Sequence, residues 1–286
     1  MRKITETVRK ELCAGAELLE EKTIGIAGFG HLGSSIVSAL LSHGFPRGRL
    51  LISHGGSAGT LERIRAAGLG CCVTDTAELM RSSDIAVLAA RPQDLLRFRG
   101  METSKDMFIL SFMAGVSLES LHKIFRAQLC RVMCSGPETI DAGRGIGVSF
   151  PSEALPRAVM EAAGLKVFDV SCESELDSFT VGICIPPIVL NMDISREEKD
   201  EAMRVMARRF PIYSELSGWI DEVVSADKGR ENSAALANVS TKGGVTEAMV
   251  GALNGGASFC SAVEAGLSRS RKLRDDIKRK LAAAAA

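Results

Sequence analysis

The sequence predicts an α/β protein in which a doubly wound parallel sheet is followed by an all-α domain. Three observations predict it. A glycine-rich turn near residue 30 joins an apolar strand to a helix, short apolar strands then alternate with helical segments to about residue 170, and only helical periodicity follows. Strands that alternate with helices favour a parallel sheet with helices on both faces.

The glycine turn is the clearest motif, because Gly28, Gly30 and Gly33 interrupt an apolar run over residues 24–37. In a dinucleotide-binding turn the first glycine permits the tight turn, the second lets the backbone approach a pyrophosphate, and the third lets the helix pack closely on its strand. The phosphates then lie on N–H groups at the helix start, as in a Rossmann-type domain. The predicted cofactor contacts are Gly28, Phe29, Gly30, His31, Leu32 and Gly33. The alternative is a turn that binds no nucleotide.

The alternation of elements continues to residue 170. We expect strands at 23–27, 49–53, 70–73, 85–90, 107–113, 129–133, 146–150 and 166–170. We expect a first helix that Gly44 ends, and helical segments at 60–67, 77–81, 95–98, 118–125 and 153–163. Strands that are apolar throughout, such as 85–90, fit a sheet that is buried on both faces.

From about Glu173 no further β-rich alternation appears, and helices are expected at 188–192, 197–210, 212–224, 245–253 and 259–280. Residues 1–21 have the pattern of a charged amphipathic helix and not of a signal peptide. We therefore expect an N-terminal helical extension (1–22), a dinucleotide-binding Rossmann domain (23–172), a helical substrate and dimerisation domain (173–281), and a remnant of a tag or linker (282–286). Apolar faces on such helices are often covered by a second subunit, so we expect a homodimer.

Composition excludes several classes of partner. Lys plus Arg and Asp plus Glu both total 35, so no net field attracts nucleic acid or an anionic membrane, and the basic run at 269–274 reads as a solvated helix face. No apolar stretch is long enough to span a bilayer. The eight cysteines lack metal-ligand spacing and read as reduced core thiols, so we expect a cytoplasmic protein without a metal site.

The end of the second strand bears on the choice of nicotinamide cofactor. An acidic residue there binds the ribose hydroxyls of NAD(H), whereas neutral or basic groups admit the 2′-phosphate of NADP(H). Residues 53–57 read Ser-His-Gly-Gly-Ser and contain no acid, which favours NADP(H) over NAD(H). The predicted contacts are Ser53, His54 and Gly55, with Ser57 as a further donor. The alternative is a flexible Gly-Gly turn, since no arginine stands there.

The whole chain resembles the pyrroline-5-carboxylate reductase family. Five ordered motifs support the resemblance, at residues 26–33, 88–93, 111–117, 131–137 and 241–246. The resemblance implies a Rossmann domain, a helical dimerisation domain, NAD(P)H as hydride donor and a cyclic imino acid as substrate. It also implies cofactor contacts at Ala90, Arg91, Pro92, Ala114 and Gly115.

The chain departs from the family mainly on the substrate side. The family's Asn-Arg-Thr after the second strand is His54-Gly-Gly here, and its Pro-Asn-Thr is Cys134-Ser-Gly. Its Gly-Ser-Gly-Pro-Ala becomes residues 184–188, Cys-Ile-Pro-Pro-Ile, which offer a substrate carboxylate neither close approach nor a hydroxyl donor. In the last motif Lys242 and Val245 replace a proline and a threonine. The cofactor half is thus better preserved than the substrate half.

An anion site is still expected near the C-terminus. Lys242, Gly243, Gly244 and Thr246 stand at the start of a helix, where N–H groups and a cation can bind a substrate carboxylate. The alternative is a solvated loop lysine at a helix entry. Imine reduction needs mainly positioning, and the candidate catalytic residues are Thr246, Thr180, Ser135 and Lys242. The alternative for the three hydroxyl residues is that each caps a helix or a turn.

Three hypotheses follow from these motifs. The first is an NADP(H)-dependent oxidoreductase that reduces the C=N bond of a small cyclic imino acid, as in proline biosynthesis. The second is a related reductase or dehydrogenase that acts on another small acid. The third is a nucleotide-binding relative without turnover, which the altered residues 184–187 make credible.

Overall fold

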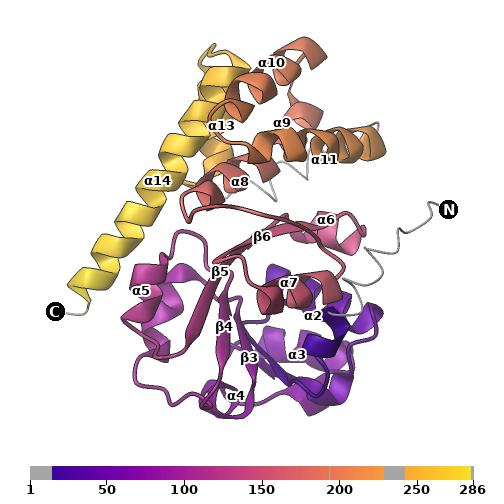
Figure 1. The fold of residues 1–286 in the computed structure, drawn as a ribbon, viewed down its shortest axis with the longest axis vertical. Coiled ribbons are helices and arrows are strands. Elements are labelled where there is room, and N and C mark those ends of the chain that lie inside the picture. The colour runs from indigo at the N-terminus through magenta and orange to yellow at the C-terminus, as the bar shows by residue number, and fades with distance from the viewer. Residues whose placement is uncertain (1–14, 193, 229–241, 285–286) are drawn as a thin grey trace.

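The computed structural model describes residues 15–192, 194–228 and 242–284, and shows a sheet with flanking helices followed by a helical region (Figure 1). The seven-stranded sheet has the order β2-β1-β3-β4-β5-β6-β7. Its strands are β1 (Ile24–Ala27), β2 (Leu50–Ser53), β3 (Ile85–Leu88), β4 (Phe108–Ser111), β5 (Gln128–Cys134), β6 (Ile146–Phe150) and β7 (Lys166–Phe168). The predicted Rossmann-type α/β fold is confirmed.

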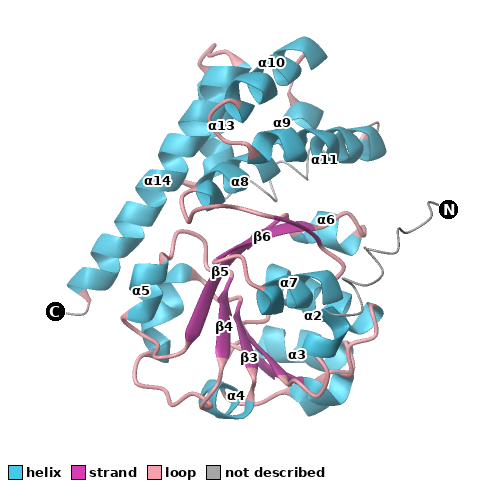
Figure 2. Cartoon of the chain, viewed as in Figure 1, coloured by secondary structure: helices cyan, strands magenta, loops and turns pink. Residues whose placement is uncertain are grey.

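Both faces of the sheet are buried. Successive side chains of a strand point to opposite faces, and along β3 the residues Ile85 and Val87 belong to one apolar core while Ala86 and Leu88 belong to another. The connecting helices that cover these faces are shown in cyan in Figure 2. They are α2 (His31–Ser42), η1 (Arg47–Arg49), α3 (Ala58–Ala66), η2 (Gly70–Cys72), α4 (Thr76–Ser82), η3 (Pro92–Phe98), α5 (Leu118–His122), α6 (Pro137–Asp141) and α7 (Ala154–Ala162).

The sheet differs from the prediction at one strand pair. All pairs from β2 to β5 are parallel, but β5 and β6 are antiparallel, with Met133 opposite Val148. A parallel crossover needs a dozen or more residues, and the connection over residues 135–145, which contains α6, is too short to return across the sheet. The expectation of a wholly parallel sheet is therefore wrong at this pair.

The strand expected at residues 70–73 is also wrong. Residues 70–72 form the 3₁₀ helix η2, and only Val73 pairs with β2, as an isolated bridge to Ile52. The Asp75 side chain accepts a hydrogen bond from the Glu78 N–H at 2.8 Å and caps α4, so the chain turns into a helix directly after this bridge.

After β7 every element in the described ranges is helical. The helices are α8 (Glu175–Ile183), α9 (Ile185–Asn191), α10 (Arg196–Ala207), α11 (Ile212–Asp227), α13 (Val245–Asn254) and α14 (Phe259–Ala283). Their shared core includes Phe179 and Tyr213 and extends to Val148 of β6 and Phe168 of β7. The helical region thus packs on the β6–β7 end of the sheet (Figure 1).

The two ends of the described chain and two of the cysteines can be compared with what the sequence predicted. Residues 15–18 are helical, whereas the rest of the expected N-terminal helix lies outside the described residues. Helix α14 continues to Ala283, so the first alanines of the tail extend it. Cys71 and Cys172 are exposed, which corrects the expectation that the thiols lie in the core, and Cys13 is not described. No helix within the described residues has both the length and the apolar character needed to cross a membrane.

Candidate active site

The glycine turn has the geometry that a dinucleotide requires. Gly28 has φ +111°, and a Cβ there would lie 2.7 Å from the Ala89 carbonyl oxygen, while a Cβ on Gly33 would lie 2.0 Å from the Gly28 carbonyl oxygen. A Cβ on Gly30 would meet no atom within 4 Å, so the turn is open at that glycine alone of the three. Gly30 also precedes α2 without a side-chain cap. The turn therefore leaves room for a diphosphate at the helix start.

The neighbouring residues of the turn divide between core and surface. Phe29 is 6% exposed and packs in the core, and the half-buried Leu32 packs against that core. His31 is exposed.

The loop after β2 contains the expected neutral groups. Ser53 is 2% exposed, and its hydroxyl accepts a hydrogen bond from the Thr76 hydroxyl at 3.2 Å, so it lies below the surface of the loop. His54 Nδ1 accepts the Gly56 N–H at 3.2 Å. Gly55 is exposed.

The loops after β3 and β4 reach the same edge of the sheet, because both strands are parallel to β1. Arg91 is exposed and forms an ion pair with Asp94, and Pro92 begins η3. Ala114 is exposed, and Gly115 has φ +75° with Ile277 of α14 directly against its Cα. The predicted cofactor residues at Gly28, His54, Ala90 and Ala114 thus follow four neighbouring strands at one edge.

A cavity of about 660 Å³ joins these loops to the helical region. It lies between η3, the loop after β4, and helices α8, α13 and α14. Of the predicted residues it brings together Pro92, Ala114, Gly115, Thr180, Lys242, Gly243, Gly244 and Thr246. The cavity therefore connects the predicted cofactor end with the predicted anion site.

The loop before α13 is held by its neighbours. Gly243 has φ +71°, its N–H donates to the Glu247 carboxylate at 2.5 Å, and its carbonyl accepts from Arg269 Nε at 2.7 Å. Gly244 precedes α13 without a side-chain cap, and Lys242 is exposed at the cavity. Backbone N–H groups and a cation thus stand at one wall of the cavity.

The two threonines of the cavity have local partners. Thr246 is 3% exposed and hydrogen-bonds Cys184, whose pKa is raised to about 11 because burial outweighs that hydrogen bond. Cys184 is therefore a neutral thiol at neutral pH. The Thr180 hydroxyl donates to the Leu176 carbonyl at 2.7 Å within α8.

The structure does not bring Ser135 to the cavity. Ser135 is 1% exposed, and its hydroxyl accepts the Ile146 N–H at 3.1 Å and the Thr139 hydroxyl at 2.6 Å. These two hydrogen bonds link the start of the β5–β6 connection to α6 and to the first residue of β6. The side chain of Ser135 therefore points into that connection and does not line the cavity, and its catalytic role stays a prediction.

The sequence did not predict two ion pairs at the cavity, each of which has one buried partner. Arg131, whose side chain is 3% exposed, donates from Nη1 to Glu173 at 2.8 Å. The Asp177 carboxylate accepts from the Ser270 hydroxyl at 3.0 Å and from Arg274. Arg274 belongs to the run expected to form a solvated face, and that expectation is wrong for it. The sequence feature that could have indicated one of these pairs is Arg131, a charged residue within the mainly apolar strand β5.

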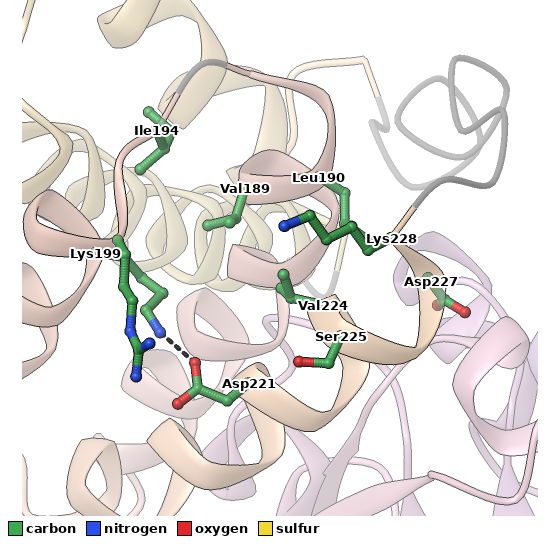
Figure 3. A pocket seen from close by; sticks show the side chains of 10 residues that line it. Val189, Leu190, Ile194, Lys199, Asp221, Val224, Ser225, Asp227 and Lys228 are labelled. Carbon is green, nitrogen blue, oxygen red and sulfur yellow. Dashed lines mark hydrogen bonds and ion pairs between the residues drawn. The ribbon is translucent and has the colours of Figure 1, made fainter.

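A second cavity of about 510 Å³ lies beside α9 and α11, and Figure 3 shows Lys199 of α10 directed toward Asp221 of α11 at its edge. Lys199 also contacts Asp200 at 2.9 Å. Burial lowers the pKa of Lys199, but its hydrogen bonds to Asp221 and Asp200 outweigh this and the net direction is upward. None of the predicted site residues lines this cavity.

Comparison with known proteins supports the resemblance. A family described as NADP oxidoreductase, coenzyme F420-dependent, matches residues 23–115. A pyrroline-5-carboxylate reductase from Vibrio alginolyticus is 25% identical over 241 residues, which cover 80% of this chain and 88% of that protein.

Solved structures share the fold. A pyrroline-5-carboxylate reductase from Coxiella burnetii has a TM-score of 0.57 at 19% identity and covers 88% of this chain and 98% of that one. The Plasmodium falciparum pyrroline carboxylate reductase with NADP bound gives 0.55 at 16% identity, covering 89% and 99%. An NADH-preferring ketol-acid reductoisomerase from an uncultured archaeon also gives 0.55, at 13% identity, covering 92% and 88%. The chain is thus similar in sequence to a pyrroline-5-carboxylate reductase and shares the fold of solved pyrroline-5-carboxylate reductases.

Proposed function

We propose that this protein is an NADP(H)-dependent reductase that transfers hydride to the C=N bond of a small cyclic imino acid. The observation that supports it most is the single cavity that joins the Ala114–Gly115 loop to the start of α13. A reductase must hold the nicotinamide and the substrate in contact, and this cavity adjoins both predicted sites. The proposal includes a Rossmann domain over residues 23–172, a substrate domain over 173–281, and a cytoplasmic homodimer formed through the helices.

The glycine turn and the loops after β2, β3 and β4 would hold the dinucleotide, with its diphosphate at Gly30, where the turn is open. When bound, the cofactor supplies a hydride from C4 of the nicotinamide. Helix α14 lines one side of the cavity with the apolar side chains of Leu273 and Ile277.

On the substrate side, Lys242 and the N–H groups at the start of α13 would bind the carboxylate. Thr246 and Thr180 are the predicted catalytic hydroxyls that line the cavity, and they would orient the imine nitrogen or relay its proton. Arg131, held in place by Glu173, adds positive charge at the same cavity. An imine is readily protonated, so positioning by these groups suffices without a nucleophile.

The test is NADPH oxidation by the purified protein with pyrroline-5-carboxylate and with a panel of other cyclic imines and small oxo acids. Turnover of the cyclic imino acid above the rest supports the proposal. Preference for an oxo acid favours the second candidate, a dehydrogenase for a different small acid, which the ketol-acid reductoisomerase match also allows. NADPH binding with no turnover favours a non-catalytic relative, which the altered residues 184–187 permit.

A further inference from the structure

Arg97 of η3 reaches the loop that follows β2. A Cβ on Gly55 would lie 3.8 Å from Arg97 Nη1, although the two residues follow different strands, β2 and β3, on either side of β1. Gly55 is exposed, so the guanidinium lies over the surface of this loop. The loop itself contains no arginine, and the structure brings one to it from elsewhere in the chain.

The guanidinium of Arg97 is available to a ligand. Its side chain is 64% exposed, and its ion pair with Asp94 runs through Nε at 3.5 Å. Among the described residues, neither Nη1 nor Nη2 of Arg97 donates a hydrogen bond. Arg91 shares the same Asp94 carboxylate. Two arginines against one carboxylate leave a net positive charge beside the loop.

A third arginine nearby is already engaged. Arg63 of α3 donates from Nη2 to the Phe29 carbonyl at 3.4 Å and to the Thr60 hydroxyl at 3.3 Å. Its guanidinium is thus bound to the glycine turn and to its own helix. Arg97 is therefore the better placed of the two for a ligand at Gly55.

The loop offers donors that complement Arg97. His54 Nδ1 accepts the Gly56 N–H, so the proton of the neutral ring lies on Nε2, which makes Nε2 a donor. Ser57 is exposed on the same loop. A phosphate dianion can accept hydrogen bonds from all three of these groups, the arginine, the imidazole N–H and the hydroxyl. The ribose hydroxyl of NAD(H) would find no acidic partner among them.

We propose that Arg97 binds the 2′-phosphate of NADP(H), in the role of the arginine that the loop after β2 lacks. The inference rests on the proposed function, because it places the adenosine end of that cofactor at His54 and Gly55. The preference for NADP(H) over NAD(H) would then depend on Arg97 of η3 and not on a residue of the loop after β2.

The test is calorimetric titration of the full chain with adenosine 2′,5′-bisphosphate and with adenosine 5′-monophosphate, which differ only in the 2′-phosphate. The wild type is expected to bind the bisphosphate more tightly. Arg97→Gln is expected to weaken bisphosphate binding about tenfold to a hundredfold, the range for a charged hydrogen bond, and to leave monophosphate binding unchanged. Arg99→Gln is the control, because it removes the same charge from an exposed residue just after η3.

Each other outcome contradicts a distinct part of the account. A wild type that binds both ligands equally overturns the NADP(H) preference, and with it this inference. A wild type that prefers the bisphosphate while Arg97→Gln behaves identically overturns the role of Arg97 alone. Equal loss of both ligands in Arg97→Gln would place the guanidinium at a part that the two ligands share, such as the 5′-phosphate, and would overturn the proposal. An equal effect of Arg99→Gln would reduce the role of Arg97 to general charge and would also overturn it.

Discussion

Arg274 of α14 donates to the buried carboxylate of Asp177 in α8, beside the cavity. The bond joins the last helix of the chain to the first helix of the helical region. Lys278, one turn further along α14, pairs with Glu119 of α5 and so connects the same helix to the Rossmann part. These two contacts hold α14 over the Ala114–Gly115 loop, where Figure 1 shows it passing beside α5.

Arg274→Met is expected to lower the free energy of unfolding by about 3 kcal/mol, because Ser270 would be the one remaining hydrogen-bond partner of the buried Asp177 carboxylate within the described ranges. Denaturant unfolding measures this. Arg279→Met is the matched control, since Arg279 pairs with Asp276 on the exposed surface of the same helix and should cost under 1 kcal/mol. Equal losses in the two variants would show that the Asp177 pair contributes no more than a surface pair.

The glycines of the turn are expected to respond differently to substitution. Gly30→Asp fits open space, so thermal unfolding should change little, while NADPH binding is lost because the carboxylate repels the diphosphate. Gly33→Ala places a Cβ against backbone and should cost about 1–3 kcal/mol of stability. Thermal unfolding combined with NADPH titration separates the two effects. Unchanged nucleotide binding in Gly30→Asp would mean that the site lies elsewhere.

Lys242→Met is expected to raise the KM for the imino acid about tenfold or more and to leave NADPH binding unchanged, because it removes a cation from the proposed carboxylate site only. Steady-state kinetics at saturating NADPH measure this. Lys272→Met on the exposed face of α14 is the control. If the two variants match the wild type, Lys242 is a solvated loop residue.

The buried thiols predict a loss of stability at high pH. Burial raises the pKa of Cys134 to about 12 from its ordinary value of 9.0, and burial likewise raises that of Cys130 to about 12 against opposing hydrogen bonds. Above pH 9 the unfolded chain loses these protons while the folded chain keeps them, so the free energy of unfolding falls as pH rises from 9 to 12. Urea unfolding across this range, compared with Cys134→Ala, checks the slope. A variant with the same slope as the wild type would exclude Cys134 as its source.

The sequence predicted what depends on local pattern. The glycine turn, the alternating elements and the helices after residue 173 are set by neighbouring residues, and the structure confirms them. The direction of β6 depended on the length of its connection, and the single bridge at Val73 depended on the Asp75 cap. Those two features needed three-dimensional context.

The candidate site was predictable in part. The loops that follow β1 to β4 lie at one edge of the sheet, because parallel strands end at the same edge. The alternation of strands and helices in the sequence predicted this arrangement. The partners Asp177 and Arg274 are far apart in the chain, as are Gly55 and Arg97, and no spacing rule joins such residues. Ser135 lies outside the cavity, because a motif gives a residue's position along the chain but not the direction of its side chain.

The central claim is that the cavity between the Ala114–Gly115 loop and α13 is where hydride passes from NADPH to a cyclic imino acid. The most direct measurement is incubation of the protein with pyrroline-5-carboxylate and NADPH that carries deuterium at both C4 positions of the nicotinamide, followed by mass spectrometry of the product. The account predicts proline carrying one deuterium, at a rate that Lys242→Met reduces at low substrate concentration. NADPH binding without any deuterated proline would contradict it.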